Sequence, residues 1–436
     1  METKSAATCG RLAAALLAAF MAALPLSHYL CLRNSLHIGY ICGTIYIFAA
    51  AAALLAVRSF LCRKAKPGKY ALLFWLLTAF GLVSSFACGD LRTSLLGSPF
   101  RGEGLLMLLS YWALFYAARL VPFPGWGRFL TRAFLVIQLV HSIYGLDQQL
   151  HFLPGPLASF DYYFYAVSGV AGNPNAMASL MVMASALALG EALYGKDLRW
   201  RAAAALMLPV FVAAMGMTKT FSAFVGLGVV VLWVLFYAAK DGGWRRLAVF
   251  CAVLAAAAAA AVMLVLRLTG EVLLWEIREQ LAQLAQLAAG GGVDPDSFAA
   301  GRPLLWRNCL ELFWEKPLTG IGIDNLMYPY LERFGLFLGQ YADKCHNEFL
   351  QVLVTMGLPA FLCWMALYVL LFRDLLRRTA AAAGQERALL RGLMLCLSGY
   401  LAQAFFNISV IDVAPYFWIF CGLAAPRLFE EPPAAH

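Results

Sequence analysis

Polar side chains of several chemical kinds stand together in the stretch DKCHNEFLQ, residues 343–351, directly before a long apolar run. Its single imidazole, His346, could take a proton from a hydroxyl group, because an unperturbed imidazole titrates close to neutral pH. Asp343 and Asn347 could orient the ring. We therefore expect His346 to be a general base. A second interpretation stays open, in which His346 and Asn347 only cap the helix that follows.

Cations in three separate stretches complete the residues that could do chemistry. A guanidinium binds two phosphate oxygens at once, whereas a lysine acts as a point charge. Several cations beside one histidine that can be neutral are typical of a site that transfers a diphosphate-linked group. The four candidates are Arg101, Lys219, Arg302 and Arg307.

Three of these cations also have simpler interpretations. Arg302 could be a loop arginine that meets lipid headgroups. Lys219 could reach the membrane surface from a helix end. Arg101 could form a local ion pair with Glu103 that contributes little.

The chain that must position these residues is strongly apolar. It has 436 residues, of which 62% are hydrophobic and 13% charged, and its mean hydropathy is +0.74. This is more apolar surface than one soluble core can bury. Apolar stretches of roughly 17–25 residues, enough to cross a bilayer as a helix, recur throughout. We expect an all-α integral membrane protein with about twelve transmembrane helices, at residues 12–32, 36–57, 70–88, 104–122, 129–150, 174–194, 202–218, 221–239, 247–268, 346–372, 392–411 and 414–426.

The distribution of Lys and Arg predicts the orientation of these helices. With the N-terminus inside, the inner segments hold 22 of the 33 Lys and Arg, and the short outer segments hold four. Cytoplasmic loops carry such an excess. We therefore expect both termini in the cytoplasm, a first helix that is retained rather than cleaved as a signal peptide, and His346 and Arg302 on the outer face. The net charge of +9 follows from this topology and indicates no nucleic-acid partner.

The chain is expected to have three parts. Residues 1–268 form a bundle of about nine spans, residues 269–345 a long external loop with amphipathic helices, and residues 346–436 about three further spans. Cys309 and Cys345 share the external loop, where oxidation is permitted. Their spacing alone leaves a disulfide between them open.

Helical signals recur within the long loop. Leucines three and four residues apart predict an amphipathic helix over 269–292. Pro303 suits the first turn of a second helix that runs through Trp314, and Pro317 ends it. The turn LTGIGIDN is then expected to lead into a third helix with Asp324 as its N-cap.

Two stretches have a recognisable order of motifs. GRPLLWRNCLELFWEKPLTGIGIDN contains Arg-x-x-x-Trp and Pro-Leu-x-Gly-x-Gly, and CHNEFLQVLVTMGLPAF begins a span with His-Asn-x-x-Leu-Gln. Together with GNPNAMAS, which begins an earlier span, they resemble the O-antigen ligase and polymerase superfamily over roughly residues 170–365. The resemblance implies an enzyme that takes a glycan from undecaprenyl diphosphate on the outer side of the bacterial cytoplasmic membrane and transfers it to an acceptor hydroxyl. It also implies a GT-C-like membrane glycosyltransferase that needs no nucleotide sugar, cofactor or metal, so the sequence DPD at 294–296 is interpreted as a loop.

The resemblance also assigns roles to residues. It makes His346 the general base and Arg302 the principal diphosphate ligand. Lys219 and Arg307 are further diphosphate candidates. In TKTFSAFVG, Phe221 stands where the family often has arginine, and Lys219 is the candidate replacement. The orienting or sugar-binding candidates are Asn347, Asp343, Asn173, Asn175 and Arg101.

The acceptor is left open by the sequence. A ligase joins a finished glycan to lipid A core, a protein or another surface polymer, whereas a polymerase joins it to another lipid-linked repeat unit. We prefer the broader description of ligase. A transporter or flippase of lipid-linked sugars would have ionisable residues near the bilayer midplane and repeated halves, but the charges here gather at the outer ends of the spans. Besides donor and acceptor, only membrane lipids are expected as partners.

Overall fold

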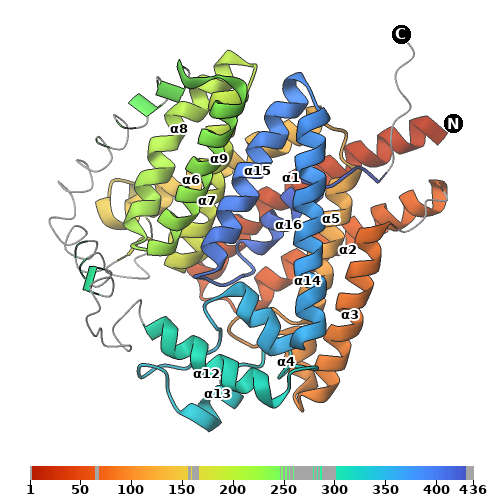
Figure 1. Ribbon diagram of the computed structural model, residues 1–436, viewed down its shortest axis with the longest axis vertical. Helices are drawn as coiled ribbons and strands as arrows, with labels where there is room; N and C mark the ends of the chain where they lie inside the picture. The colour runs from red at the N-terminus through yellow and green to blue at the C-terminus, as the bar shows by residue number, and fades with distance from the viewer. Residues whose placement is uncertain are drawn as a thin grey trace.

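The computed structural model describes residues 2–63, 68–155, 166–245 and 301–428, together with isolated positions in the intervening segments. No named β-strand occurs in this part of the chain. The elements are α1 (Glu2–Asn34), α2 (Gly39–Arg63), α3 (Lys69–Ala87), α4 (Leu91–Leu96), α5 (Leu105–Leu120), α6 (Gly125–Leu150), the 3-10 turn η2 (Gly169–Ala171), α7 (Pro174–Tyr194), α8 (Leu198–Met217), α9 (Phe221–Asp241), α12 (Arg302–Glu315), α13 (Met327–Phe334), α14 (Glu348–Ala381), α15 (Gly384–Ala404) and α16 (Ala414–Ala424). The long helices form one bundle, with α12 and α13 at one of its ends (Figure 1).

The expected spans correspond to helices wherever the structure describes them. Among the described residues, eight helices are long and apolar enough to cross a membrane: α1, α2, α3, α6, α7, α8, α9 and α14. Helices α5 and α16 are shorter and apolar. The span expected at 247–268, the amphipathic helix expected at 269–292 and the sequence DPD lie largely or wholly outside the described residues. The all-α membrane class is confirmed, whereas the number of twelve spans and the GT-C likeness stay predictions.

One expected boundary is wrong. The span predicted at 392–411 ends at Ala404, and the chain up to residue 413 forms turns. The Asn407 side chain holds this segment across the start of α7, because its Nδ2 donates to the carbonyl of Asn175 at 3.2 Å and its Oδ1 accepts from the N–H of Ile408 at 2.8 Å. These polar contacts replace further helical hydrogen bonds.

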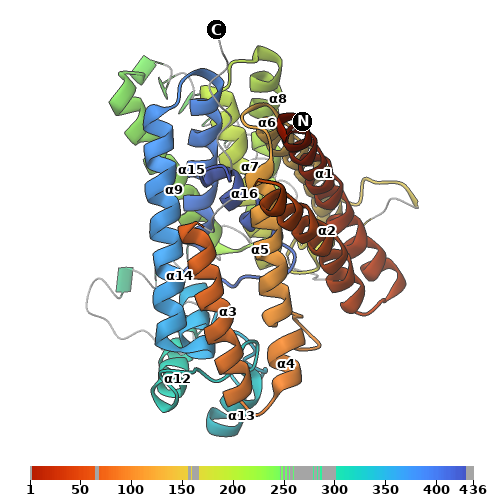
Figure 2. The ribbon, with the colours of Figure 1, turned by 90° about the vertical axis from the view of Figure 1, so that its right-hand side faces the viewer.

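Helix α7 occupies the centre of the bundle. In its most apolar window, 89% of the residues are buried, and it packs against α8, α9 and α15. A Cβ built on Gly190 would lie 2.5 Å from Cα of Gly392, so the lack of side chains lets α7 and α15 approach closely. Away from α7, helices α3 and α14 run side by side along the length of the bundle (Figure 2).

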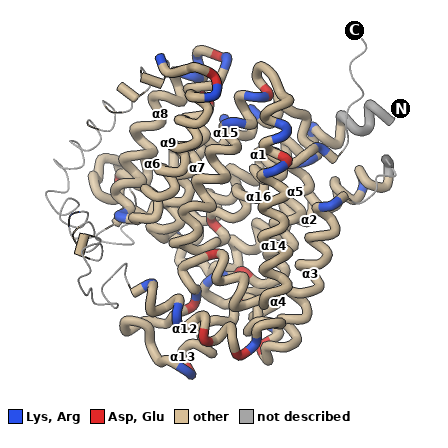
Figure 3. The backbone as a smooth tube through the Cα atoms, in the orientation of Figure 1, with Lys and Arg blue, Asp and Glu red and all other residues tan. Residues whose placement is uncertain are grey.

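Charged residues mark the two ends of the bundle. Lys and Arg gather at the end away from α12 and α13, residues of both signs lie near α12 and α13, and the middle has few (Figure 3). This separation is what the sequence predicts for helices that cross a membrane. It makes the two ends chemically different.

A tight turn after α12 inserts into a break in α14. The backbone of α14 is non-helical at Gly357, and the N–H of Ile321 donates to the carbonyl of Val354 at 3.1 Å. Gly320 has a φ of 70°, and a Cβ there would lie 2.4 Å from the carbonyl of Thr355. The turn therefore needs glycine both for its backbone conformation and for space.

The helices around this turn are partly as expected. A helix from Pro303 through Trp314 is confirmed by α12, but Asp324 is not the N-cap of α13. That cap is Leu326, which makes no side-chain cap bond. Asp324 has a φ of 57° and is buried, and its Oδ2 accepts from the N–H of Ser98 at 2.6 Å. The carboxylate finds its partners inside the protein rather than at the helix end.

Candidate active site

A cavity of about 1100 Å³ lies at the end of the bundle that carries α12 and α13. Segments far apart in the sequence form its wall: the end of α1, the loop before α5, η2 with the start of α7, the chain from α12 to residue 346, and residues 410–412. Four candidates from the sequence line it: Arg101, Asn173, Asp343 and His346. The cavity therefore gathers polar chemistry from both halves of the chain.

Arg101 and Asp343 form a two-point ion pair in this wall. Arg101 Nε lies 2.6 Å and Nη2 3.2 Å from the two carboxylate oxygens of Asp343. Burial alone would raise the pKa of Asp343, but the bonds from Arg101 outweigh it and hold that pKa below its ordinary value. The suggested pair between Arg101 and Glu103 is wrong, because Glu103 has another partner.

That partner is Lys344, which is buried between two carboxylates. Its Nζ lies 3.0 Å from Glu103 Oε2 and 2.8 Å from Asp324 Oδ1, and only 4% of the residue is exposed. Burial would lower the pKa of Lys344, but Asp324 and Glu103 outweigh it and raise the pKa. Burial raises the pKa of Glu103. These two ion pairs hold the segment before His346 against the loop before α5. The charge of Lys344 is therefore already balanced by Glu103 and Asp324.

His346 differs from Asp343 and Lys344, because no ion pair or hydrogen bond holds its side chain in the described part of the protein. Its Nδ1 is buried and has no hydrogen-bond partner in the described part of the protein. The residue has a φ of 49°, an uncommon conformation for a side chain of this size. Burial, and then the nearby charge of Arg302, lower the pKa of His346 to about 4, although Asp343 acts in the opposite direction. The ring is therefore a neutral imidazole at physiological pH.

Arg302 reaches this region through the helical spacing of its motif. It is the first residue of α12, after Gly301 with a φ of 70°. One turn later, Trp306 Nε1 donates to the carbonyl of Cys345 at 3.0 Å, directly before His346. Residues four apart share a helix face, so this bond brings Arg302 toward the histidine. Burial lowers the pKa of Arg302, and no carboxylate pairs with it in the described residues.

The segment that contains these motifs matches a known family. Residues 202–365 match the family model described as O-antigen ligase. Over this segment, which is less than half of the chain, the protein is similar to O-antigen ligases. The match confirms the superfamily resemblance, and the matched segment includes Lys219, Arg302, Asp343 and His346. Comparison with curated proteins gave no match.

Three of the cations predicted from the sequence are not in the lining of the cavity: Arg302, Arg307 and Lys219. The side chain of Arg307 is 77% exposed and lies 3.5 Å from Glu311, one turn further along α12. Lys219 is in the turn between α8 and α9, with a φ of 53°. The adjacent Thr220 donates to Asn175 Oδ1 at 3.4 Å, so this turn packs beside the start of α7.

Of the three asparagine candidates, Asn173 and Asn347 cap helices, and Asn175 accepts the hydrogen bond from Thr220. Asn173 caps α7 through bonds to the N–H groups of Asn175 and Ala176, and it also lines the cavity. Asn347 caps α14 by accepting from the N–H of Leu350 at 3.0 Å. The capping interpretation is thus correct for Asn347, although not for His346.

The two loop cysteines are neighbours in the interior. Cys309 and Cys345 are both buried, and both are free thiols in the structure. Their contact contributes to a small apolar cluster that joins α12 to the beginning of α14. The segment before His346 is held by this cluster as well as by Trp306.

Sequence reasoning missed a pair of residues in the cavity wall. His28, near the end of α1, lies with its Nδ1 3.0 Å from Asp412 Oδ1, in the segment before α16. The Nε2 of His28 is buried without a hydrogen-bond partner among the described residues. Each is an ionisable residue in or beside an apolar span, and that signal marks functional candidates. Both lie outside the O-antigen ligase match.

Proposed function

We propose that the protein transfers a glycan from a polyprenyl-diphosphate carrier, undecaprenyl diphosphate, to the hydroxyl group of an acceptor at the cavity described above. The observation that carries this proposal is the neutral His346, whose Nδ1 has no partner among the described residues and whose pKa is lowered by nearby Arg302, in a segment similar to O-antigen ligases. An unpaired buried polar atom calls for an explanation, and a substrate group is one.

His346 acts as the general base. The acceptor oxygen attacks C1 of the donor sugar, the bond from C1 to the diphosphate oxygen breaks, and the diphosphate leaves with the electron pair. The proton of the hydroxyl passes to the imidazole. Attack from the face opposite the diphosphate inverts the configuration at C1. A base in position contributes about a hundred- to ten-thousandfold to the rate of such a step.

The low pKa of His346 has a consequence for binding order. An imidazole with a pKa of about 4 is neutral but weakly basic. A diphosphate that pairs with Arg302 offsets the positive charge that lowers this pKa, so the base becomes stronger once the donor is bound. Donor binding would thereby activate the acceptor step.

Arg302 is the principal ligand of the diphosphate. Its guanidinium has no acidic partner in the described residues, so its donors are available to phosphate oxygens. Arg101 and Lys344 are occupied by carboxylates, and we assign them to holding the segment around His346. Asn173 is the remaining candidate for a sugar contact, because it lines the cavity.

The position of the charges favours transfer over transport. Charged residues gather at the ends of the bundle (Figure 3), whereas coupled transporters place ionisable groups near the membrane midplane. We place the protein in the bacterial inner membrane with the cavity on the outer face, as the Lys and Arg distribution predicts. Reporter fusions at Gly242 and Gly384 should read cytoplasmic and a fusion at Ser159 external; the reverse pattern would overturn this orientation.

The proposal is tested by transfer in vitro with the purified full-length protein. The donor is a defined undecaprenyl-diphosphate glycan, and lipid A core, a second donor molecule and a protein are offered as acceptors. Product on the second donor molecule would make the enzyme a polymerase, and product on another acceptor a ligase. Activity should persist in excess EDTA, because the cations do the work of a metal.

Matched arginine variants test the site itself. Arg302→Gln should lower kcat/KM by at least about tenfold, as expected for a lost charge-assisted hydrogen bond. Arg307→Gln removes the same charge from the exposed face of the same helix and should leave the rate unchanged. Equal effects of both substitutions, or full activity of Arg302→Gln, would remove Arg302 from the site.

A further inference from the structure

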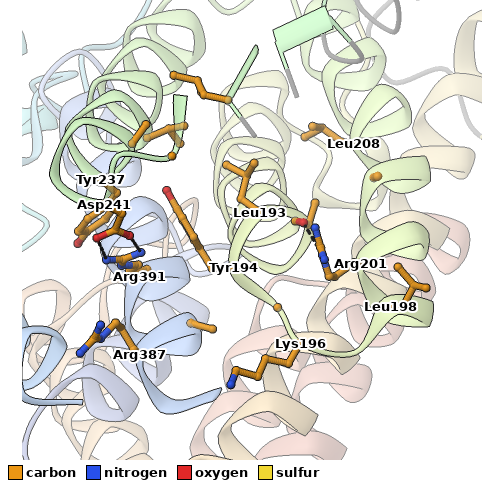
Figure 4. Close-up of a pocket in the computed structure, with 18 of the residues that line it drawn as sticks. Leu193, Tyr194, Lys196, Leu198, Arg201, Leu208, Tyr237, Asp241, Arg387 and Arg391 are labelled. Atoms are coloured by element: carbon orange, nitrogen blue, oxygen red, sulfur yellow. Dashed lines mark hydrogen bonds and ion pairs between the residues drawn. The ribbon is translucent and has the colours of Figure 1, made fainter. Parts of the chain in front are cut away.

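A second large cavity lies at the other end of the bundle from His346. Its volume is about 1050 Å³, and it opens where the loop between α7 and α8, the end of α9 and the start of α15 meet (Figure 4). Five cations line it, with one acid, Asp241, in the described lining. These cations are Lys196, Arg201, Arg245, Arg387 and Arg391.

One of the five cations is neutralised inside the wall. Arg391 donates to both carboxylate oxygens of Asp241, at 2.5 and 3.1 Å, and its guanidinium lies over the rings of Tyr194 and Tyr237 at 5.0 and 4.5 Å from their centroids. Arg391 is only 8% exposed, and its Nε has no hydrogen-bond partner in the described part of the chain. The wall therefore contains a buried guanidinium with a spare donor.

Two further arginines are fixed through one nitrogen each. Arg201 Nε donates to the carbonyl of Ala192 at 3.0 Å, and Arg387 Nε donates to the carbonyl of Ala382 at 2.6 Å. These bonds position the guanidinium groups, and within the described residues they leave the Nη nitrogens for another acceptor. Asp241 is the one acid in the described lining and is paired with Arg391, so an anion in the cavity would find the other cations without an acidic partner there.

Apolar residues line the same cavity between and beside the cations. They include Leu193, Leu208 and Val234, and elsewhere on α8 and α9 the apolar residues Leu206 (76%) and Leu232 (64%) are exposed. A free anion would use only the cations. A lipid phosphate would use both kinds of residue, with its headgroup among the cations and its acyl chains along α8 and α9.

We propose that this cavity binds an anionic phosphate group, carried by a membrane phospholipid with net negative charge. The proposal does not depend on glycan transfer at the first cavity. The Lys and Arg residues at this end of the bundle would then bind a ligand in addition to setting the orientation of the helices in the membrane.

Native mass spectrometry of the full-length protein in detergent tests the proposal. The protein is titrated with dioleoyl phosphatidylglycerol, with zwitterionic dioleoyl phosphatidylcholine and with inorganic phosphate. Phosphatidylglycerol should bind at least about tenfold more tightly than phosphatidylcholine, because its phosphate charge is not compensated within the headgroup. Equal binding of the two lipids would overturn the proposal. If inorganic phosphate binds but does not displace phosphatidylglycerol, the lipid does not occupy the phosphate site, and the lipid part of the proposal is wrong.

Matched double variants localise the site. Lys196→Gln with Arg387→Gln changes two exposed residues of the cavity, so the fold should persist, and the phosphatidylglycerol dissociation constant should rise at least about tenfold. Arg199→Gln with Arg377→Gln removes the same charge from exposed positions outside the cavity lining and should leave the constant unchanged. Equal changes in both variants would show attraction by net charge alone and would overturn the site.

Discussion

At His346, burial and the guanidinium of Arg302 act in the same direction, because both disfavour the imidazolium. The neighbouring residues are fixed differently. Asp343 is paired with Arg101, and Lys344 lies between two carboxylates. Of these three ionisable residues in one short stretch, only the histidine is left for a substrate.

The first prediction concerns the pH dependence of transfer. A base works when deprotonated, so activity is present above its pKa and lost as the pH falls through it. The acid limb of kcat/KM, which reports the free enzyme, should lie near the pKa of about 4. The acid limb of kcat should lie at higher pH, because bound diphosphate raises that pKa. An acid limb that persists unchanged in His346→Ala would assign it to another group.

The second prediction concerns the pair of His28 and Asp412. If the free Nε2 of His28 binds a substrate hydroxyl, His28→Asn should raise the KM for one substrate about tenfold, the effect of one lost hydrogen bond to a polarised group. Asp412→Asn should have a similar effect, because the carboxylate orients the ring. His37→Asn, at an exposed position in the next loop, is the control. A lower melting temperature with unchanged KM values would make the pair a structural contact between α1 and the segment before α16.

At the scale of elements, α12 and the start of α14 are positioned by a few contacts. Pro303 predicts the start of α12 and Pro317 its end, and that prediction is confirmed. The break in α14 was not predicted, because a continuous apolar run gives no sign that another turn will insert at Gly357. Asp324 was misplaced for a similar reason. Its partners, Ser98 and Lys344, are distant from it in the sequence.

Trp306 provides a prediction at this scale. Trp306→Phe keeps the aromatic contacts with Phe405 and Phe406 but removes the Nε1 bond to the carbonyl of Cys345. Loss of one hydrogen bond costs about 1 kcal/mol, and the displaced Arg302 should lower kcat about tenfold or more. Trp314→Phe changes an exposed residue of the same helix and should have no effect on transfer. Normal kcat in Trp306→Phe would mean that packing alone positions the arginine.

Gly320 provides a second prediction at the scale of elements. Ala at this position meets both a positive φ and a carbonyl at 2.4 Å, so Gly320→Ala should lower the melting temperature of the purified protein. Gly242→Ala is the control, because its φ of 65° and ψ of 20° are left-handed helical but nothing lies within 4 Å of the added Cβ. The positive φ alone costs about 1–2 kcal/mol. The two variants should therefore differ, and equal melting temperatures would mean that α14 yields to the turn.

For the whole molecule, hydropathy predicts the described helices well, and local motifs predict the residues of the site that are close in sequence. The wall of the cavity could not be predicted in this way. It depends on pairs such as Arg101 with Asp343 and His28 with Asp412, which become neighbours only when the bundle closes. A single sequence contains the polar residues but not the pairing.

The pairing of cations in the cavity wall bears on how substrates arrive. Arg101 and Lys344 are matched by Asp343, Glu103 and Asp324, so their fields cancel within a short distance, and physiological salt screens the remainder over roughly 8 Å. Encounter with the anionic donor should then be governed by diffusion within the membrane rather than by electrostatic steering. We expect kcat/KM to change less than about threefold between roughly 50 and 500 mM NaCl, whereas steered association would slow by ten- to a thousandfold. A steep decline with ionic strength would mean that unscreened cations outside the wall guide the donor.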